Sequence, residues 1–386
     1  MAVPFLSRIM ELLGLSTAFR ALRFRNFRLF FIGQIISVTG SWMQQVAMGW
    51  MVYRLTNSPL MLGVVGFVSQ IPSFLLSPFA GVLVDHANRH RIIIITQALS
   101  MLQACLLAVL VLTDTISVPK IVVLGGFLGL IIAVDIPARH AFLFEMVDDK
   151  EDLGNAIALN SMMFNAARLI GPSLAGVLIG FWGEGLCFVL NAVSYVAVIV
   201  ALLAMRLSPR LLPQVNGRPL HKLLEGLRYA FGFAPIRSIL LLVAVMSLMA
   251  MSATVLMPMF ARDILGGGPH TLGFLMAAIG CGALVGALFV ASRKKTIGLS
   301  RLIPVSSGLL FGLGMIVFSF SRHLPLSMLV LFFTGLGLMI HMVLCNTVLQ
   351  TVVDDDKRGR VMSLYTMAFM GMATFGSLLG GALASR

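Results

Sequence analysis

The chain has 386 residues, of which 59% are hydrophobic and 11% are charged, and its mean hydropathy is +0.98. Soluble domains carry about 25% charged residues, and a water-soluble enzyme of this length could not bury so much apolar surface. A membrane-spanning helix needs about 20 apolar residues. The composition therefore predicts an all-helical protein that crosses a membrane many times.

Apolar runs in chain order predict eleven spans in two groups. The first six lie at about 28–53, 60–84, 91–112, 120–143, 155–180 and 184–205. Five more lie at about 238–261, 270–292, 301–320, 325–349 and 360–385. We therefore expect a six-helix half over 1–205, a polar linker over 206–237 and a five-helix half over 238–386.

The net charge of +13 indicates a membrane orientation rather than a nucleic-acid partner. With the N-terminus in the cytoplasm, 22 of the 28 Lys and Arg residues fall in segments on the inner side, as the positive-inside rule requires.

Leucines at 220, 223, 224 and 227 predict an amphipathic helix in the linker that lies on the inner membrane surface. A soluble helix that packs on a partner is the alternative. We expect the protein in the inner membrane of a bacterium.

An internal repeat supports two equivalent halves. Residues 154–178 and 359–383 align at a constant offset of 205. The aligned glycines are Gly154 with Gly359, Gly171 with Gly376, and Gly176 with Gly381. Corresponding spans in two parallel halves are typical of one large transporter fold. Pro172, next to Gly171, predicts a bend in the fifth span.

Residues 81–91 read Gly-Val-Leu-Val-Asp-His-Ala-Asn-Arg-His-Arg. This segment resembles the signature of the major facilitator superfamily, G-x-L-x-D-x-x-G-R-[RK], with Asn88 in place of the second glycine and His90 in place of the final Arg or Lys. Asparagine tolerates left-handed backbone, so we expect the turn to be kept. The resemblance implies that this segment meets span eleven and helps to hold an inner gate shut. The expected gate residues are Gly81, Asp85, Arg89, Arg91, Arg139, Gly359 and Arg360.

Other stretches resemble the branch of that superfamily that contains the enterobactin exporter, macrolide-efflux proteins and transmembrane secretion effector proteins. They lie at 40–45, 135–139, 155–160, 168–176, 225–229 and 358–365. The resemblance implies twelve spans and a central cavity walled by spans one, four, seven and ten. Because the chain stops just after the eleventh span, we expect the twelfth to be missing.

Ionisable groups inside spans require an explanation, because each costs about 2.5–3.5 kcal/mol to insert. Asp135 in span four and Arg168 in span five predict an ion pair between adjacent helices. The pair could be a static salt bridge, or its protonation could shift the balance between inward- and outward-open states. His341 in span ten is a third candidate for proton coupling, since histidine exchanges protons near neutral pH. A bond to a neighbouring hydroxyl or carbonyl is the alternative.

Span one carries a polar stripe at spacings of three, four and three, formed by Gln34, Ser37, Ser41 and Gln44. The resemblance places this span at the central cavity, so these four side chains are candidate substrate contacts, together with Asn160 and Asn346. Hydrogen bonds between helices are the alternative. Gly171, Pro172 and Gly176 are expected to serve bending and close packing.

Catalytic and metal-binding motifs are absent from the sequence, including an ATP-binding loop, a nucleophile elbow and paired metal ligands. We therefore expect no enzyme activity, no cofactor and no metal. The expected function is that of a monomeric secondary transporter, which exports a small amphipathic drug or siderophore by alternating access in exchange for protons. A dedicated siderophore or lysophospholipid carrier, or an inactive truncated membrane protein, are alternatives.

Overall fold

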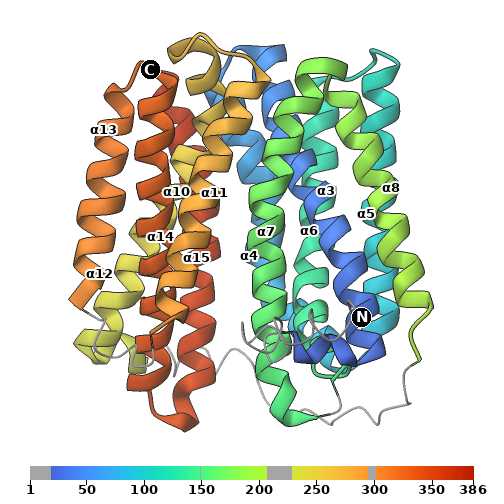
Figure 1. Cartoon of the computed structure of the whole chain (residues 1–386), viewed down its shortest axis with the longest axis vertical. Helices are drawn as coiled ribbons and strands as arrows, with labels where there is room; N and C mark the ends of the chain where they lie inside the picture. The colour runs from blue at the N-terminus through green and yellow to red at the C-terminus, as the bar shows by residue number, and fades with distance from the viewer. Residues whose placement is uncertain (1–18, 148, 207–227, 294–300) are drawn as a thin grey trace, which may run out of the picture.

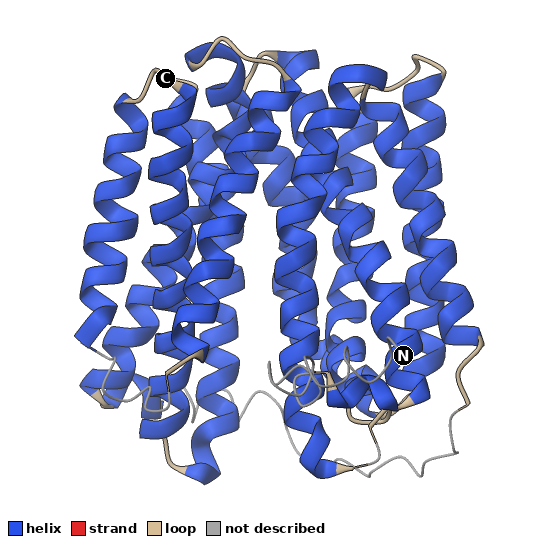
Figure 2. Ribbon diagram, in the orientation of Figure 1, coloured by secondary structure: helices blue, strands red, loops and turns tan. Residues whose placement is uncertain are grey.

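The computed structural model describes residues 19–147, 149–206, 228–293 and 301–386, which fold almost wholly into helices (Figure 1, Figure 2). The first part of the chain forms η1 (Arg20–Arg23), α3 (Arg25–Thr56), α4 (Pro59–Asp85), α5 (Arg89–Leu112), α6 (Val118–Leu143), α7 (Lys150–Trp182) and α8 (Glu184–Leu203). The second part forms α10 (Ala234–Met259), η2 (Phe260–Ile264), α11 (Pro269–Ala291), α12 (Leu302–Pro304), η4 (Val305–Leu313), α13 (Gly314–Phe320), α14 (Leu324–Val352) and α15 (Asp355–Ala384).

Ten helical stretches in the described part of the chain are long and apolar enough to cross a membrane. They coincide with ten of the eleven predicted spans. The first predicted span corresponds to α3, which is 32 residues long but falls below the others in hydropathy because glutamines and serines interrupt it. The predicted linker helix lies within residues 207–227, outside the described residues.

The helices form two bundles that stand side by side in Figure 1. In the first bundle, α3 packs against α7 and α8, α4 against α6, and α5 against α6 and α8. In the second bundle, α10 packs against α15, and α11 against α14. The bundles meet along two helix pairs, α4 with α15 and α7 with α11. Each of these seams joins the second helix of one bundle to the fifth helix of the other.

Glycines bring the backbones into contact at both seams. A Cβ atom on Gly176 of α7 would stand 2.8 Å from the Cα atom of Gly273 of α11. A Cβ atom on Gly381 of α15 would likewise stand 2.8 Å from the Cα atom of Gly63 of α4. Small residues permit such close helix crossings. Residues 176 and 381, which the sequence offset of 205 aligns, thus make equivalent contacts at the two seams.

The second aligned glycine pair packs within the bundles instead. A Cβ atom on Gly171 would stand 2.6 Å from Trp42 Cβ of α3, and one on Gly376 would stand 2.3 Å from the carbonyl oxygen of Leu248 of α10. In both bundles, therefore, the fifth helix lies directly against the first. Pro172 lies inside α7, which continues as one helix from Lys150 to Trp182.

The turn between α4 and α5 does not use the left-handed backbone that asparagine tolerates. Asn88 has φ −71° and ψ 103°, which is extended rather than left-handed. Its side-chain oxygen accepts a hydrogen bond of 3.0 Å from the backbone N–H of Arg91. The turn between the two helices is kept, with asparagine as the N-cap of α5.

We call the end of the molecule that holds residues 57–58, 183 and 265–268 the closed end, because side chains join the two bundles there. It lies at the top of Figure 1. Deeper along the seam, at the level of the cavity, the ring of Phe375 of α15 packs on α4, with centroids 5.9 Å from Phe67 and 6.2 Å from Phe74. Phe181 of α7 packs on His270 of α11, at 5.6 Å.

At the opposite end, the open end, several ion pairs and hydrogen bonds lie within one bundle. Arg23 contacts Asp149 at 3.2 Å within the first bundle. Tyr229 and Lys357 both donate to Asp354 at 3.2 Å within the second. The hydrogen bond from Lys357 lowers the pKa of the exposed Asp354 carboxyl. In Figure 1 the helices of the two bundles meet at the closed end and stand further apart at the open end.

Candidate functional site: a cavity between the two bundles

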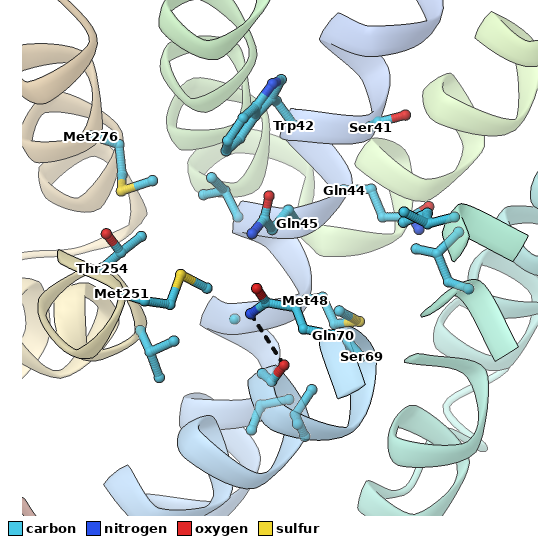
Figure 3. Close-up of a pocket in the computed structure, with 18 of the residues that line it drawn as sticks. Ser41, Trp42, Gln44, Gln45, Met48, Ser69, Gln70, Met251, Thr254 and Met276 are labelled. Carbon is cyan, nitrogen blue, oxygen red and sulfur yellow. Dashed lines mark hydrogen bonds between the residues drawn. The ribbon is translucent and has the colours of Figure 1, made fainter. Parts of the chain in front are cut away.

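A cavity of about 350 Å³ lies between the bundles (Figure 3). Helices α3, α4, α6, α7 and α8 of the first bundle and α10 and α11 of the second form its wall. Helix α14, the predicted tenth span, contributes none of the described wall residues. Figure 3 shows side chains that face one another across the cavity: Trp42, Gln45 and Met48 on one side and Met251, Thr254 and Met276 on the other.

The described wall is mostly apolar, with several neutral polar side chains and one charged one. The polar groups are Ser41, Gln44, Gln45, Ser69, Gln70, Tyr195 and Thr254, and the charged group is Arg139. Ligand pockets with an apolar lining and a few polar groups bind small amphipathic molecules. Methionines suit such a wall because their flexible side chains adapt to different shapes.

Asp135 of α6 is buried beside this cavity, inside the first bundle, with 3% of its surface exposed. One carboxylate oxygen accepts hydrogen bonds from Thr96 Oγ1 at 2.7 Å and from Gln97 Nε2 at 2.9 Å, both on α5. The other oxygen forms an ion pair of 2.5 Å with Arg139, one helical turn later on α6. The carboxylate is therefore fully partnered.

The predicted pair between Asp135 and Arg168 is not formed. The guanidinium of Arg168 lies over the indole ring of Trp42, 5.6 Å from its centroid. The prediction failed because Arg139 occupies the i,i+4 position on the same helix as Asp135, where the two side chains meet directly.

Arg139 links the buried carboxylate to the cavity. Its Nη1 donates to Gln34 Oε1 at 3.0 Å, and its guanidinium lies 5.7 Å from the centroid of the Phe164 ring. The Nε atom of Arg139 has no hydrogen-bond partner among the described residues. The side chain also lines a small pocket next to the cavity, which it shares with Asn160. Arg139, expected as a gate residue, thus stands at the cavity wall.

The predicted polar stripe on α3 points mainly into the first bundle. Gln34, Ser37 and Gln44 are at most 2% exposed, and Ser37 donates to Gln97 Oε1 at 3.5 Å. Ser41 and Gln44 also line the cavity. The alternative of hydrogen bonds between helices thus describes most of the stripe. The neighbouring Gln45 faces the cavity and was not predicted.

A second buried network, which sequence reasoning missed, joins α3, α5 and α8. Gln44 donates to Gln103 Oε1 at 2.9 Å and accepts from Asn191 Nδ2 at 2.8 Å. Gln97, Ser100 and Gln103 recur at spacings of three on α5, and this spacing is the signal that could have revealed a polar face.

Asn191→Ala is expected to destabilise the protein by about 1–3 kcal/mol, because it leaves the buried Gln44 oxygen without a donor. The measurement is the apparent Tm in detergent. Val193→Ala is the control, since Val193 lies on the same helix and is 59% exposed. Equal Tm values for the two variants would contradict the proposed importance of the network.

The sequence comparison decides the family. A model of the family described as transmembrane secretion effector matches residues 16–386. The chain belongs to the transmembrane secretion effector family. The staphyloferrin A transporter of Staphylococcus aureus is 26% identical to it over 353 residues, which cover 91% of this chain and 87% of that protein.

Two further relatives of this transmembrane secretion effector protein align with similar fractions of the chain. The multidrug efflux pump Tap of Mycolicibacterium fortuitum is 26% identical over 348 residues, 88% of this chain and 84% of that one. The enterobactin exporter EntS of Citrobacter koseri is 28% identical over 360 residues, which cover 92% of this chain and 84% of that protein. The resemblance noted in the sequence is thereby confirmed.

Among solved structures, a bacterial homologue of the human lysosomal transporter Spinster, in an inward-facing and unoccupied conformation, shares the fold. Its TM-score is 0.72 at 15% identity, over 94% of this chain and 83% of that one. The transmembrane secretion effector proteins belong to the major facilitator superfamily. The chain is therefore a multi-pass membrane protein and a secondary transporter of small molecules, not an enzyme.

Three of the predicted polar candidates lie away from the cavity of this transmembrane secretion effector protein. His341 is fully buried, bonds to the backbone of Ile303, and lies 3.5 Å from the sulfur of Cys345. Asn346 accepts a hydrogen bond of 2.6 Å from Gln350 on its own helix. Asn160 lines only the small pocket. The ordinary explanation for His341, a partnered histidine between helices, matches this geometry.

Part of the predicted gate can be described. Arg89 forms an ion pair of 2.8 Å with Glu145, which connects the start of α5 to the end of α6. Arg91 is exposed at the open end. The side chains of Gly81, Asp85, Gly359 and Arg360 lie outside the described residues.

Polar side chains join the bundles at the closed end. The Tyr53 hydroxyl of α3 donates to the carboxylate of Asp263 in η2. Arg262 Nη1 donates to Asn57 Oδ1 at 2.8 Å. We call these four residues the latch. It adds directional contacts to the close helix crossings at the seams.

Proposed function

We propose that this protein exports a small amphipathic compound, such as a drug or a siderophore, by alternating access driven by protons. The observation that carries the proposal is the cavity between the two bundles, with Arg139 at its wall and Asp135 paired to Arg139 beside it. Three relatives whose names describe siderophore or drug transport support this substrate range.

We further propose that the open end faces the cytoplasm. The positive-inside distribution of Lys and Arg supports this orientation. The arginines at 23, 25, 28, 89 and 91 all belong to the open end. The state described above is then inward-open, with α3 as an eleventh span. The halves are residues 1–205 and 238–386, joined by the linker 206–237.

Proton coupling is assigned to the Asp135–Arg139 pair. A proton taken up by Asp135 would remove its negative charge and weaken its hold on Arg139. Arg139 also contacts Gln34 of α3 and faces the cavity, so its release would change the wall. A local charge change that biases two global states is the general basis of such switches.

A dedicated siderophore carrier is the second candidate. It is favoured by two relatives, the staphyloferrin A transporter and the enterobactin exporter. Its cavity would reject most other amphipathic compounds, whereas a drug exporter would accept many.

Energised everted vesicles that contain the protein test these proposals. Radiolabelled siderophores, drugs and lysolipids are added singly, and accumulation is followed with and without an uncoupler. We expect gradient-dependent accumulation of several amphipathic compounds, and a dedicated carrier would accumulate siderophores alone. Accumulation of no compound by folded protein would contradict export.

The latch is expected to stabilise the state in which the closed end is shut, and a variant that weakens it should shift the protein toward the opposite state. Tyr53→Phe is expected to weaken closure of the outer end by about 1 kcal/mol, or roughly fivefold. The reporter is Gln45→Cys in a background without the four native cysteines, labelled by an impermeant maleimide from the outer side. Tyr229→Phe is the matched control, because its tyrosine–aspartate bond stays within one bundle. Equal labelling rates in both variants would contradict a role for the latch.

A further inference from the structure

Arg168 is a cation in the middle of α7 for which the described part of the chain supplies no carboxylate. It makes no hydrogen bond or ion pair with the described residues, and its contact is the indole face of Trp42 at 5.6 Å. Arg139, in contrast, is neutralised by Asp135. An ionisable group inside a membrane is costly, so it is typically kept where it serves a substrate or ion pathway.

The position of Arg168 places it at the edge of the cavity. It follows Phe164 by four residues, so the two side chains project from the same face of α7. Phe164 lines the cavity, and so does Trp42, over which Arg168 lies. On its other side α7 meets α11, where a Cβ atom on Gly280 would stand 3.5 Å from the backbone oxygen of Arg168. Arg168 therefore lies where the cavity borders the seam between the bundles.

The charge of the wall favours anions. Among the described residues that line the cavity none is Asp or Glu, and Arg139 is paired with Asp135. Arg168 is not itself one of the wall residues, but beside Trp42 it adds a positive charge for which the described residues supply no carboxylate. A lipophilic cation would find no counter-charge among these side chains, whereas an anion would find a planar donor suited to carboxylate and phosphate groups.

We propose that the cavity binds amphipathic molecules that carry an anionic group, with Arg168 as the counter-charge for that group. Trp42 and the methionines at 48, 251 and 276 would contact the apolar body. This inference rests on the proposed export function and specifies its substrate class.

Anion and proton then occupy separate sites. Arg139 lies at the level of Gln34, and Arg168 at the level of Trp42, eight residues further along α3. This separation corresponds to about 12 Å along the helix axis. An anion at Arg168 therefore leaves the Asp135–Arg139 pair intact, as proton exchange requires.

The test compares three probes that share one aromatic body: pyrenebutyrate, pyrenebutanol and pyrenebutyl-trimethylammonium. Binding to the purified full chain in neutral nanodiscs is followed by energy transfer from tryptophan to pyrene, with empty nanodiscs subtracted. Because charge-assisted hydrogen bonds to arginine are strong, we expect the anion to bind about tenfold more tightly than the cation. Arg168→Gln should abolish this preference and Arg168→Lys should keep part of it.

Arg322→Gln is the matched control, because Arg322 is exposed in the 321–323 turn and its loss removes the same charge far from the cavity. Equal binding of anion and cation by the wild type, or a preference that survives Arg168→Gln, would overturn the inference while export stands. Binding of none of the three probes would contradict the proposed function as well. If Arg168→Gln does not fold, the wild-type comparison and Arg168→Lys decide.

Discussion

Replacing Gly381 with alanine is expected to weaken the closed end and, in the proposed orientation, to raise external labelling of the Gln45→Cys reporter. A Cβ atom there would stand 2.6 Å from the carbonyl oxygen of Pro59 and 2.8 Å from Gly63 Cα, both backbone atoms of α4. Overpacking of this kind costs about 1–3 kcal/mol, which corresponds to a roughly 5- to 150-fold shift between states. Transport should fall, because the inward-open state becomes rare.

Gly176→Ala should have the same effect, since it creates the equivalent contact with Gly273 at the other seam. Gly154→Ala is the control: it lies on α7, and a Cβ atom there meets nothing within 4 Å. Unchanged labelling in both seam variants would contradict the role of the glycine crossings in closure. Increased labelling in the control would show that the reporter responds to general loosening.

Asp135→Asn is expected to lower stability as well as abolish proton coupling. The amide still accepts hydrogen bonds from Thr96 and Gln97, but Arg139 loses its counter-charge. Leaving one member of a buried pair alone costs about 3 kcal/mol, at the lower end of the usual range because the Arg139 side chain is 18% exposed. The apparent Tm in detergent should fall by several degrees.

The double variant Asp135→Asn/Arg139→Met separates charge from packing. Removing both charges is often neutral for stability, so we expect it to regain most of the lost Tm while remaining inactive in proton exchange. A double variant that is less stable than either single variant would show that the pair does not act as a unit. Restored proton exchange in the double variant would contradict its assignment to these residues.

The spans could be predicted because apolar runs of membrane-crossing length are unambiguous in a chain of this composition. The equivalence of Gly176 and Gly381 was also visible as a sequence offset. Their partners Gly63 and Gly273 were not, because which helices cross depends on tertiary packing. The i,i+4 spacing of Asp135 and Arg139 could have identified the ion pair, but Arg168 was chosen because both residues are membrane-embedded.

The direction of polar faces was the harder problem. The stripe on α3 was identified correctly as a stripe, yet a stripe does not reveal which neighbour covers it. Gln34 and Gln44 bond to neighbouring helices of the first bundle, while Gln45, one residue further, faces the cavity. His341 was a candidate for proton coupling because histidine exchanges protons near neutral pH. Of its two partners, Cys345 lies on the same helix and Ile303 lies on α12.

The most direct test of the account is proton release from proteoliposomes that contain the purified chain in one orientation. A pH gradient is imposed, and a compound accumulated in the vesicle experiment is added. We expect substrate-triggered proton movement in the wild type and in Arg322→Gln, and none in Asp135→Asn/Arg139→Met. Substrate transport without proton movement in the wild type, or proton movement that persists in the double variant, would contradict proton exchange through the Asp135–Arg139 pair.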